Sequence, residues 1–487
     1  MQSSKSASGN EASPTPEIVS APFLRRIEKL ALILLEHRFN SSQDLWKFQL
    51  DLLHLQRDIQ GAVNDCKSKP RRELPMEVLT EVRVCRWHAR RLGDAFAWVV
   101  LGGDKKVIEP LSENKRIPIS RDGHGSRGML LIASHLGNQG WGFPLIHDIT
   151  DFLRIGDLTF VRVSENSKRS YQTVEVKTRA QLKRRLAGQN LAEYEYQVQV
   201  LSAAPFDHAQ SGPVKLHDAE FDSVIANAVR PIDERAIRQA KRMSAALAHQ
   251  TAKANELIRQ EGGIPAIWSE VSTPVTRHWR TLQKVVRKAR RSGYASECVD
   301  GAFLYTAFYN HGGISVESMG SPSRIHEAIS NSGLLIQDGS RDNAISIYPI
   351  PANESRGAHV FRPFYLYPIP RTSICDIIYG RMIIVVFLNE SRLVESLERA
   401  GFSVEVTSNA KDRQIKIGRQ IAAGSGENYY AQYPNFRHYL NEIVYEFNGR
   451  ESIIHIAETI FETAGNMAAE IRREAEHKGT RRPRLLP

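Results

Sequence analysis

The sequence predicts a multidomain protein of the α/β class, with an α-helical module first, an α/β core in the middle and an α/β or α+β domain last. Three observations predict this. The chain has 487 residues, which is too long for one ordinary hydrophobic core. Its content of 41% hydrophobic and 24% charged residues is typical of globular proteins. The period of its apolar residues also changes, from helical spacing in the first hundred residues to strand-like alternation after residue 155.

The first hundred residues are expected to be helical behind a disordered start. Residues 1–20 are rich in Ser, Pro and small residues, which predicts disorder. Residues 21–103 form the expected α-helical module. Apolar residues recur there every three or four positions from Phe23 to about Ala62, and again from Met76 to about Leu101.

Residues 104–210 form the expected α/β core. Asp157–Val163 and Tyr171–Lys177 both alternate between apolar and polar residues, and a polar turn separates them, which predicts a β-hairpin. The basic segment Gln181–Leu191 is expected to be a helix. Tyr194–Leu201 is expected to be the next strand.

The second half of the chain is expected to contain three further parts. Residues 211–295 are rich in charged, helix-forming residues and predict a basic helical connector. In residues 296–450, strand-like apolar runs alternate with helical segments, which predicts the C-terminal α/β or α+β domain. Residues 451–487 predict a C-terminal helix and a basic tail.

Composition limits the function. The formal net charge of +11 favours a polyanionic partner such as nucleic acid, although many globular proteins are simply basic. The four cysteines are scattered without CxxC spacing, which argues against a zinc ribbon or a disulfide framework. The N-terminus has no apolar leader, and no uncharged stretch is long enough to span a membrane. We therefore expect a cytoplasmic protein without membrane contact.

The predicted hairpin carries three side chains suited to metal-assisted hydrolysis. Asp157 opens the first strand, and the strand period of two places Lys177 on the same face as Glu175. Cleavage of a phosphodiester at neutral pH uses metal ions that bind the phosphate and activate water. Mg²⁺ prefers oxygen ligands, usually one or two carboxylates plus water. Asp157 and Glu175 are therefore expected to hold Mg²⁺ or Mn²⁺, and Lys177 to assist the attacking water.

The order helix, Gly-Asp strand, Glu-Val-Lys strand, helix, strand resembles the PD-(D/E)xK nuclease superfamily over roughly residues 130–202. The resemblance implies a restriction-endonuclease-like core and a metal-dependent nuclease, with DNA as the expected substrate and antiviral defence as the expected role. It implies that Asp157, Glu175 and the carbonyl oxygen of Val176 bind the metal, and that Lys177 is catalytic. A dimer would suit cleavage of both strands.

Several choices stay open at the level of sequence. An additional acidic ligand is either Asp148 or Asp151, which lie three residues apart. Gln189, Gln197 and Gln199 are all candidates to contact the phosphate or the water. The hairpin also has a simpler interpretation, a surface element whose glutamate and lysine form an ordinary ion pair.

Two groups of cations are candidates for binding nucleic acid. The predicted helix Val275–Arg291 carries a cationic stripe with no acidic residue, formed by Arg277, Arg280, Lys284, Arg287, Lys288 and Arg291. The second group, Lys183, Arg184 and Arg185, follows the Glu-Val-Lys strand. Cations spaced in this way favour contact with a phosphate backbone, although a solvated helix face is the simpler explanation. The alternative function is therefore a catalytically silent or partner-gated nucleic-acid-binding protein, its partner belonging to a defence system.

Overall fold

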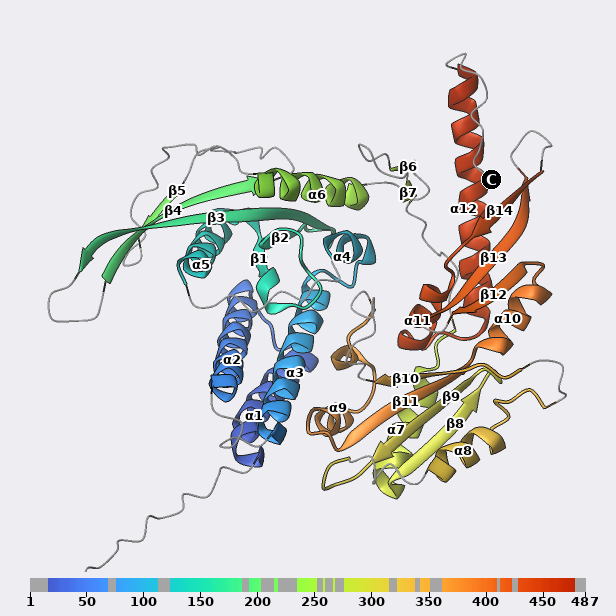
Figure 1. Ribbon diagram of the computed structural model, residues 1–487. Coiled ribbons are helices and arrows are strands. Elements are labelled where there is room, and N and C mark those ends of the chain that lie inside the picture. The colour runs from blue at the N-terminus through green and yellow to red at the C-terminus, as the bar shows by residue number, and fades with distance from the viewer. Residues whose placement is uncertain are drawn as a thin grey trace, which may run out of the picture.

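The computed structural model has a mixed α/β architecture (Figure 1). It describes residues 16–68, 76–112, 123–185, 192–202, 214–217, 234–251, 257–258, 266–267, 276–314, 322–337, 342–350, 361–409, 412–422 and 428–477. Residues 1–15, for which disorder is expected, and residues 478–487, which include the expected basic tail, lie outside these ranges. Within them, no helix is both long enough and apolar enough to cross a membrane.

Three long helices form the N-terminal layer: α1 Pro16–Leu35, α2 Ser42–Ser68 and α3 Met76–Val100. They pack against one another, as the helical spacing of their apolar residues predicts. One boundary was predicted wrongly, because residues 16–20 belong to α1 and are not disordered. Ser20 is buried against α3, where its hydroxyl donates to Glu81 at 2.7 Å, so tertiary contact orders this segment.

The central sheet has five strands in the order β1-β2-β3-β4-β5, and every neighbouring pair is antiparallel. Its strands are β1 Phe143–Ile146, β2 Leu158–Val163, β3 Arg169–Arg185, β4 Ala192–Ser202 and β5 Val214–His217. The short helix α4 Lys105–Leu111 follows α3. Helices α5 His124–Leu136 and α6 Glu234–Thr251 both contact the β3–β4 hairpin, α5 below it and α6 above it in Figure 1.

The prediction of a basic helix over Gln181–Leu191 is wrong for residues 181–185, and residues 186–191 lie outside the described part. Strand β3 continues to Arg185, and β4 pairs with it back from Ala192. Lys and Arg favour helix locally, but pairing with a strand that buries Tyr196 and Val198 outweighs that preference. The Glu-Val-Lys strand therefore leads into a long antiparallel hairpin, without the helix that the resemblance implies after it.

The C-terminal half contains a second antiparallel sheet, in the order β10-β11-β9-β8. Its strands are β8 Tyr294–Val299, β9 Phe303–Tyr309, β10 Ile345–Ile350 and β11 Met382–Asn389, and the helices beside it are α7 Trp279–Ser292, α8 Pro322–Asn331 and α9 Arg371–Ile378. Because α7 packs on β8 and β9, it belongs to this layer and not to a connector ending at residue 295.

A third sheet, β12-β13-β14, completes the C-terminal half. Its elements are β12 Ser403–Asn409, β13 Asp412–Ala422, β14 Asn428–Tyr433, α10 Glu390–Arg399, α11 Arg437–Tyr445 and α12 Glu451–His477. Helices α11 and α12 pack against β13. Two short strands, β6 Leu257–Ile258 and β7 Ala266–Ile267, pair with each other.

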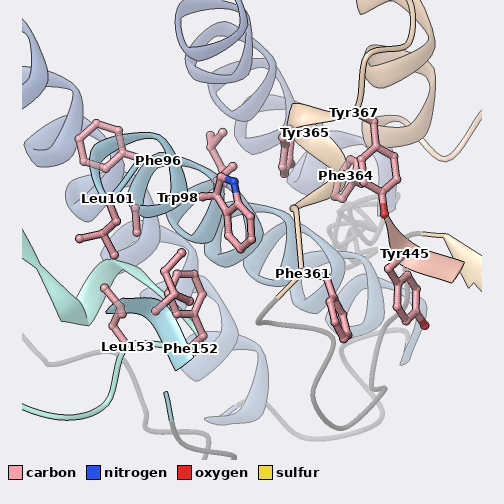
Figure 2. Close-up of a cluster of buried hydrophobic side chains, with 14 of the residues drawn as sticks. Phe96, Trp98, Leu101, Phe152, Leu153, Phe361, Phe364, Tyr365, Tyr367 and Tyr445 are labelled. Atoms are coloured by element: carbon pink, nitrogen blue, oxygen red, sulfur yellow. The ribbon is translucent and has the colours of Figure 1, made fainter. Parts of the chain in front are cut away.

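The N-terminal helices are packed directly on the C-terminal half. Figure 2 shows aromatic side chains of α3 and of the segment 361–367 in one buried region. The rings of Trp87 and Phe364 stack with 6.0 Å between centroids and an interplanar angle of 3°. The Tyr365 hydroxyl lies 3.3 Å from Nδ1 of the buried His88. Helix α3 is therefore held between the central sheet and the C-terminal half.

Candidate active site

The start of β2 fixes Asp157 against β3. Its backbone N–H donates to the carbonyl oxygen of Val174 at 2.8 Å, and its Oδ2 accepts from the N–H of Val176 at 2.7 Å. The preceding Gly156 has φ 75°, and a Cβ there would lie 2.6 Å from Cγ2 of Thr173. Glycine is therefore required at this position both for its backbone conformation and for the close approach to β3.

Glu175 and Lys177 lie on the same face of β3, as the strand period predicts. Lys177 Nζ is 2.6 Å from Glu175 Oε1. The glutamate is only 4% exposed, whereas the lysine side chain is 34% exposed. An ordinary surface ion pair would leave both groups in water, so the burial of Glu175 argues against that interpretation.

Neighbouring carboxyl groups disfavour the charged form of Asp157. Burial, followed by the charge of Glu175, raises the pKa of Asp157 from 3.8 to about 7. The N–H of Val176 acts in the opposite direction, and Asp148 raises this pKa further. Burial also raises the pKa of Asp148, against the opposing effect of Arg90. Three acidic groups therefore influence one small region that is partly shielded from water.

Asp148 and Asp151, the two candidates for an additional acidic ligand, have different surroundings. Asp148 acts electrostatically on Asp157. Asp151 instead faces α3, where its N–H donates to Asp94 Oδ1 at 2.7 Å and its Oδ1 lies 3.4 Å from Arg90 Nε. Asp148 is therefore the acidic neighbour of the site, and Asp151 anchors the loop between β1 and β2.

The carboxylate oxygens of Asp157 and Glu175 are donor atoms of the type that a hard divalent cation prefers. Among the described residues, no group of three or more His, Cys, Asp or Glu side chains is arranged to hold a metal. Magnesium, however, is commonly bound by one or two carboxylates with water and phosphate completing its shell. Asp157 and Glu175 provide two carboxylates. Because the N–H and C=O of a strand residue point to the same side, the carbonyl oxygen of Val176 faces Asp157, where its N–H donates.

Two buried glutamines of α2 hold the segment in front of Asp157. Gln49 donates to the carbonyl oxygen of Pro144 and accepts from the N–H of Ile146, both at 2.9 Å, so its amide satisfies the free edge of β1. Gln56 donates to the carbonyl oxygen of Ile149 at 2.8 Å. This role of the two glutamines was not predicted from the sequence. Its signal was two glutamines seven residues apart on the apolar face of one helix.

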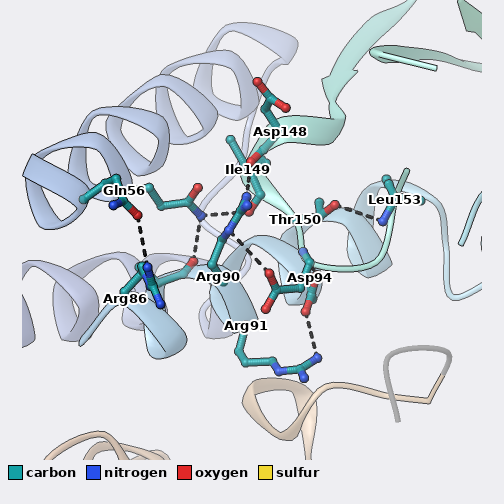
Figure 3. A network of polar contacts seen from close by, with 12 residues as sticks. Gln56, Arg86, Arg90, Arg91, Asp94, Asp148, Ile149, Thr150 and Leu153 are labelled. Atoms are coloured by element: carbon teal, nitrogen blue, oxygen red, sulfur yellow. Dashed lines mark hydrogen bonds and ion pairs between the residues drawn. The ribbon is translucent and has the colours of Figure 1, made fainter. Parts of the chain in front are cut away.

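Charged residues of α3 complete this support (Figure 3). Arg90 donates to the carbonyl oxygen of Asp148. Asp94, which accepts from the N–H of Asp151, also pairs with Arg91 at 3.1 Å. Burial raises the pKa of Asp94 to about 7, against the opposing charge of Arg91. The loop that leads to Asp157 is therefore tied to α3 through backbone atoms as well as charges.

The remaining candidate residues lie in three places. Gln199 on β4 is the register partner of Lys177, and Gln197 is the partner of Arg179, while Gln189 lies outside the described residues. The backbones of Lys183, Arg184 and Arg185 belong to the far end of β3, and their side chains are outside the described part. The cations of the predicted helix Val275–Arg291 lie on or just before α7, on a different sheet from Glu175.

No family model, curated protein or solved structure matches the chain. The resemblance to the PD-(D/E)xK superfamily therefore depends on the β2–β3 hairpin and its charged residues alone.

Proposed function

We propose that the protein is a metal-dependent nuclease that hydrolyses phosphodiester bonds, with DNA as substrate, and that its central sheet is a variant of the restriction-endonuclease-like core. The observation that carries the proposal is that the buried Glu175, which is bonded to Lys177, acts on the half-buried Asp157, whose pKa is raised to about 7. Like charges placed together in a shielded site are typical of functional sites, because a bound cation relieves the repulsion.

Each residue has a role that follows from its position. Asp157, Glu175 and the carbonyl oxygen of Val176 would hold Mg²⁺ or Mn²⁺, which supplies positive charge that lowers the pKa of a water and offsets the charge of the phosphate. Lys177 is bonded to Glu175 but keeps a third of its side chain exposed. It can therefore donate a hydrogen bond to an incoming phosphate or water while Glu175 keeps it oriented.

The departure from the expected order of elements does not affect these roles. All four residues lie on the β2–β3 hairpin or immediately before it, and that hairpin is present. The helix that is replaced by the long β3–β4 hairpin would follow the site in sequence and contributes none of the named groups. The proposal therefore requires only the hairpin and the loop before it.

The test is cleavage of linear and supercoiled DNA by the purified full chain with Mg²⁺, with Mn²⁺ and with a chelator. Glu175→Ala and Lys177→Ala should each lower the rate at least about a hundredfold, as is usual when a metal ligand or a positioned acid–base group is removed. Glu165→Ala and Lys168→Ala are matched controls, because both residues are exposed on the turn of the same hairpin. Equal cutting by all five proteins would show that a contaminant is responsible.

The second candidate is a catalytically silent or partner-gated nucleic-acid-binding protein. The exposed cations of α7 favour it, because they are suited to binding and lie on a different sheet from the carboxylates. Under this alternative, wild type and both site variants bind DNA equally well and none of them cuts. Addition of a protein partner that restores metal-dependent cutting to wild type alone would identify gating.

A further inference from the structure

Helix α7 presents a cationic face on the C-terminal half of the molecule. Its opposite face is buried on β8 and β9 through Leu282, Val285, Val286 and Ala289. The exposed face carries Arg280, Lys284, Arg287, Lys288, Arg290 and Arg291. The helix contains no acidic residue, so neutralisation of this face has to come from neighbouring elements.

Neighbouring carboxylates neutralise only part of this face. Lys284 pairs with Glu297 of β8 at 2.7 Å, and Arg290 pairs with Asp376 of α9 at 2.9 Å. Within the described part of the chain, the other exposed cations of α7 have no carboxylate at ion-pair distance. These four residues, which we call the α7 cation row, are Arg280, Arg287, Lys288 and Arg291.

The α7 cation row is held on a rigid support. The Trp279 ring lies 4.7 Å from the ring of Phe447 and 5.2 Å from that of Tyr367, measured between centroids. Gln283 donates to the carbonyl oxygen of Pro368, and Arg290 ties the last turn to α9. The helix therefore presents its cations without first having to be ordered, which lowers the entropic penalty of binding.

We infer that the α7 cation row binds the phosphate backbone of duplex DNA, independently of hydrolysis at the central sheet. From Arg280 to Arg291 the helix rises about 16 Å, a length over which one strand of a duplex presents about five phosphates. Proteins that bind single strands add exposed aromatic rings on which bases stack. The one aromatic residue of α7, Trp279, is packed inward instead, so the face suits a backbone whose bases remain paired.

Contacts with phosphates depend on charge and do not distinguish one base sequence from another. The four cations of the row are proposed to contact phosphates, which carry no direct sequence information. Affinity should therefore be similar for duplexes of different sequence and fall steeply with salt. Each phosphate contact contributes about 0.9 to the slope of log K against log salt on duplex DNA.

The experiment is fluorescence anisotropy of the full chain with a short labelled duplex, in a chelator and over a series of salt concentrations. Replacing all four residues of the row with Gln should reduce the slope by about 3 to 4 and weaken binding on the order of a thousandfold at about 0.1 M salt. The matched control replaces four exposed cations of α1–α3 with Gln, which removes the same charge elsewhere: Arg25, Lys29, Lys67 and Arg83. Circular dichroism and thermal unfolding establish that both variants are folded.

An unchanged slope in the row variant, or an equal loss in the control, would overturn the inference. So would tighter binding to single-stranded than to duplex DNA, or binding to phosphatidylserine-containing vesicles that depends on the row while duplex binding does not. Glu175→Ala separates this inference from the proposed nuclease. Retained binding with lost cleavage supports both, and retained binding with no cleavage by any variant leaves only the α7 inference standing.

Discussion

Replacing Asp157 with Asn should stabilise the metal-free protein at alkaline pH. Burial and the charge of Glu175 raise the pKa of Asp157 from 3.8 to about 7, so the folded protein disfavours its carboxylate form. That difference corresponds to about 4 kcal/mol of unfolding free energy once the group is ionised in both states. An Asn side chain still accepts a hydrogen bond from Val176 N–H, so the variant removes the electrostatic penalty and keeps this contact.

The effect has a defined pH dependence. Since the folded state binds the Asp157 proton more tightly than the unfolded state, the contribution of this group to stability falls as pH rises from about 4 to about 7. The gain from Asp157→Asn should therefore be about 2 kcal/mol at about pH 5 and about 4 kcal/mol at about pH 8. Asp94, whose pKa is also about 7, is present in both proteins, so it contributes to both measurements equally.

Urea unfolding in a chelator at the two pH values measures both gains. Glu165→Gln, on the exposed turn of the hairpin, is the control and should change stability at neither pH. At alkaline pH, Mg²⁺ should raise the unfolding free energy of wild type but not of Asp157→Asn, because the variant has lost a proposed ligand. A variant that is less stable than wild type at both pH values would refute the claim that the folded protein disfavours the carboxylate form of Asp157.

Three further predictions concern the support of the site and the packing of α3. Gln49→Leu leaves two buried backbone groups of β1 without their partner and should lower the unfolding free energy by about 2–5 kcal/mol, measured by urea titration. Gly93→Ala places a Cβ 1.8 Å from the carbonyl oxygen of Ile149 and should lower the melting temperature by several degrees in calorimetry. Burial lowers the pKa of His88 to about 3, so wild type should lose stability between about pH 6.5 and about pH 3, and His88→Gln should flatten that dependence in unfolding titrations.

The sequence predicts those parts of the fold that have a regular period. Helices α1 to α3 and the β2–β3 hairpin lie where the apolar spacing places them. The helix prediction for Gln181–Leu191 failed over its described residues 181–185. Their composition favours a helix, while the backbone partner that makes them a strand lies on β4. The placement of α7 failed for a related reason. An apolar stripe predicts a buried face but not the sheet that buries it.

In the candidate site, too, the sequence predicts what depends on local periodicity and not what depends on distant segments. The sequence places Glu175 and Lys177 together because a strand repeats every two residues, and the structure has them 2.6 Å apart. It left Asp148 and Asp151 as alternatives, because their surroundings differ through α3, more than fifty residues earlier, whose Asp94 accepts a hydrogen bond from the N–H of Asp151. Supporting contacts of this kind leave no local pattern in the sequence.

These supporting contacts explain how the protein can keep acidic groups close together at all. The effect of Glu175 on the charge of Asp157 would be relieved if the loop between β1 and β2 moved away from β3. The loop cannot do so without breaking two hydrogen bonds of its backbone, in which Gln56 donates to the carbonyl oxygen of Ile149 and Asp94 accepts from the N–H of Asp151. Each broken bond leaves an unsatisfied polar group. Contacts with the helical layer thus keep Asp157 near Glu175, although their charges disfavour this arrangement. A divalent cation bound between the carboxylates would remove this unfavourable interaction and so gain affinity. For this reason we place the proposed metal site here.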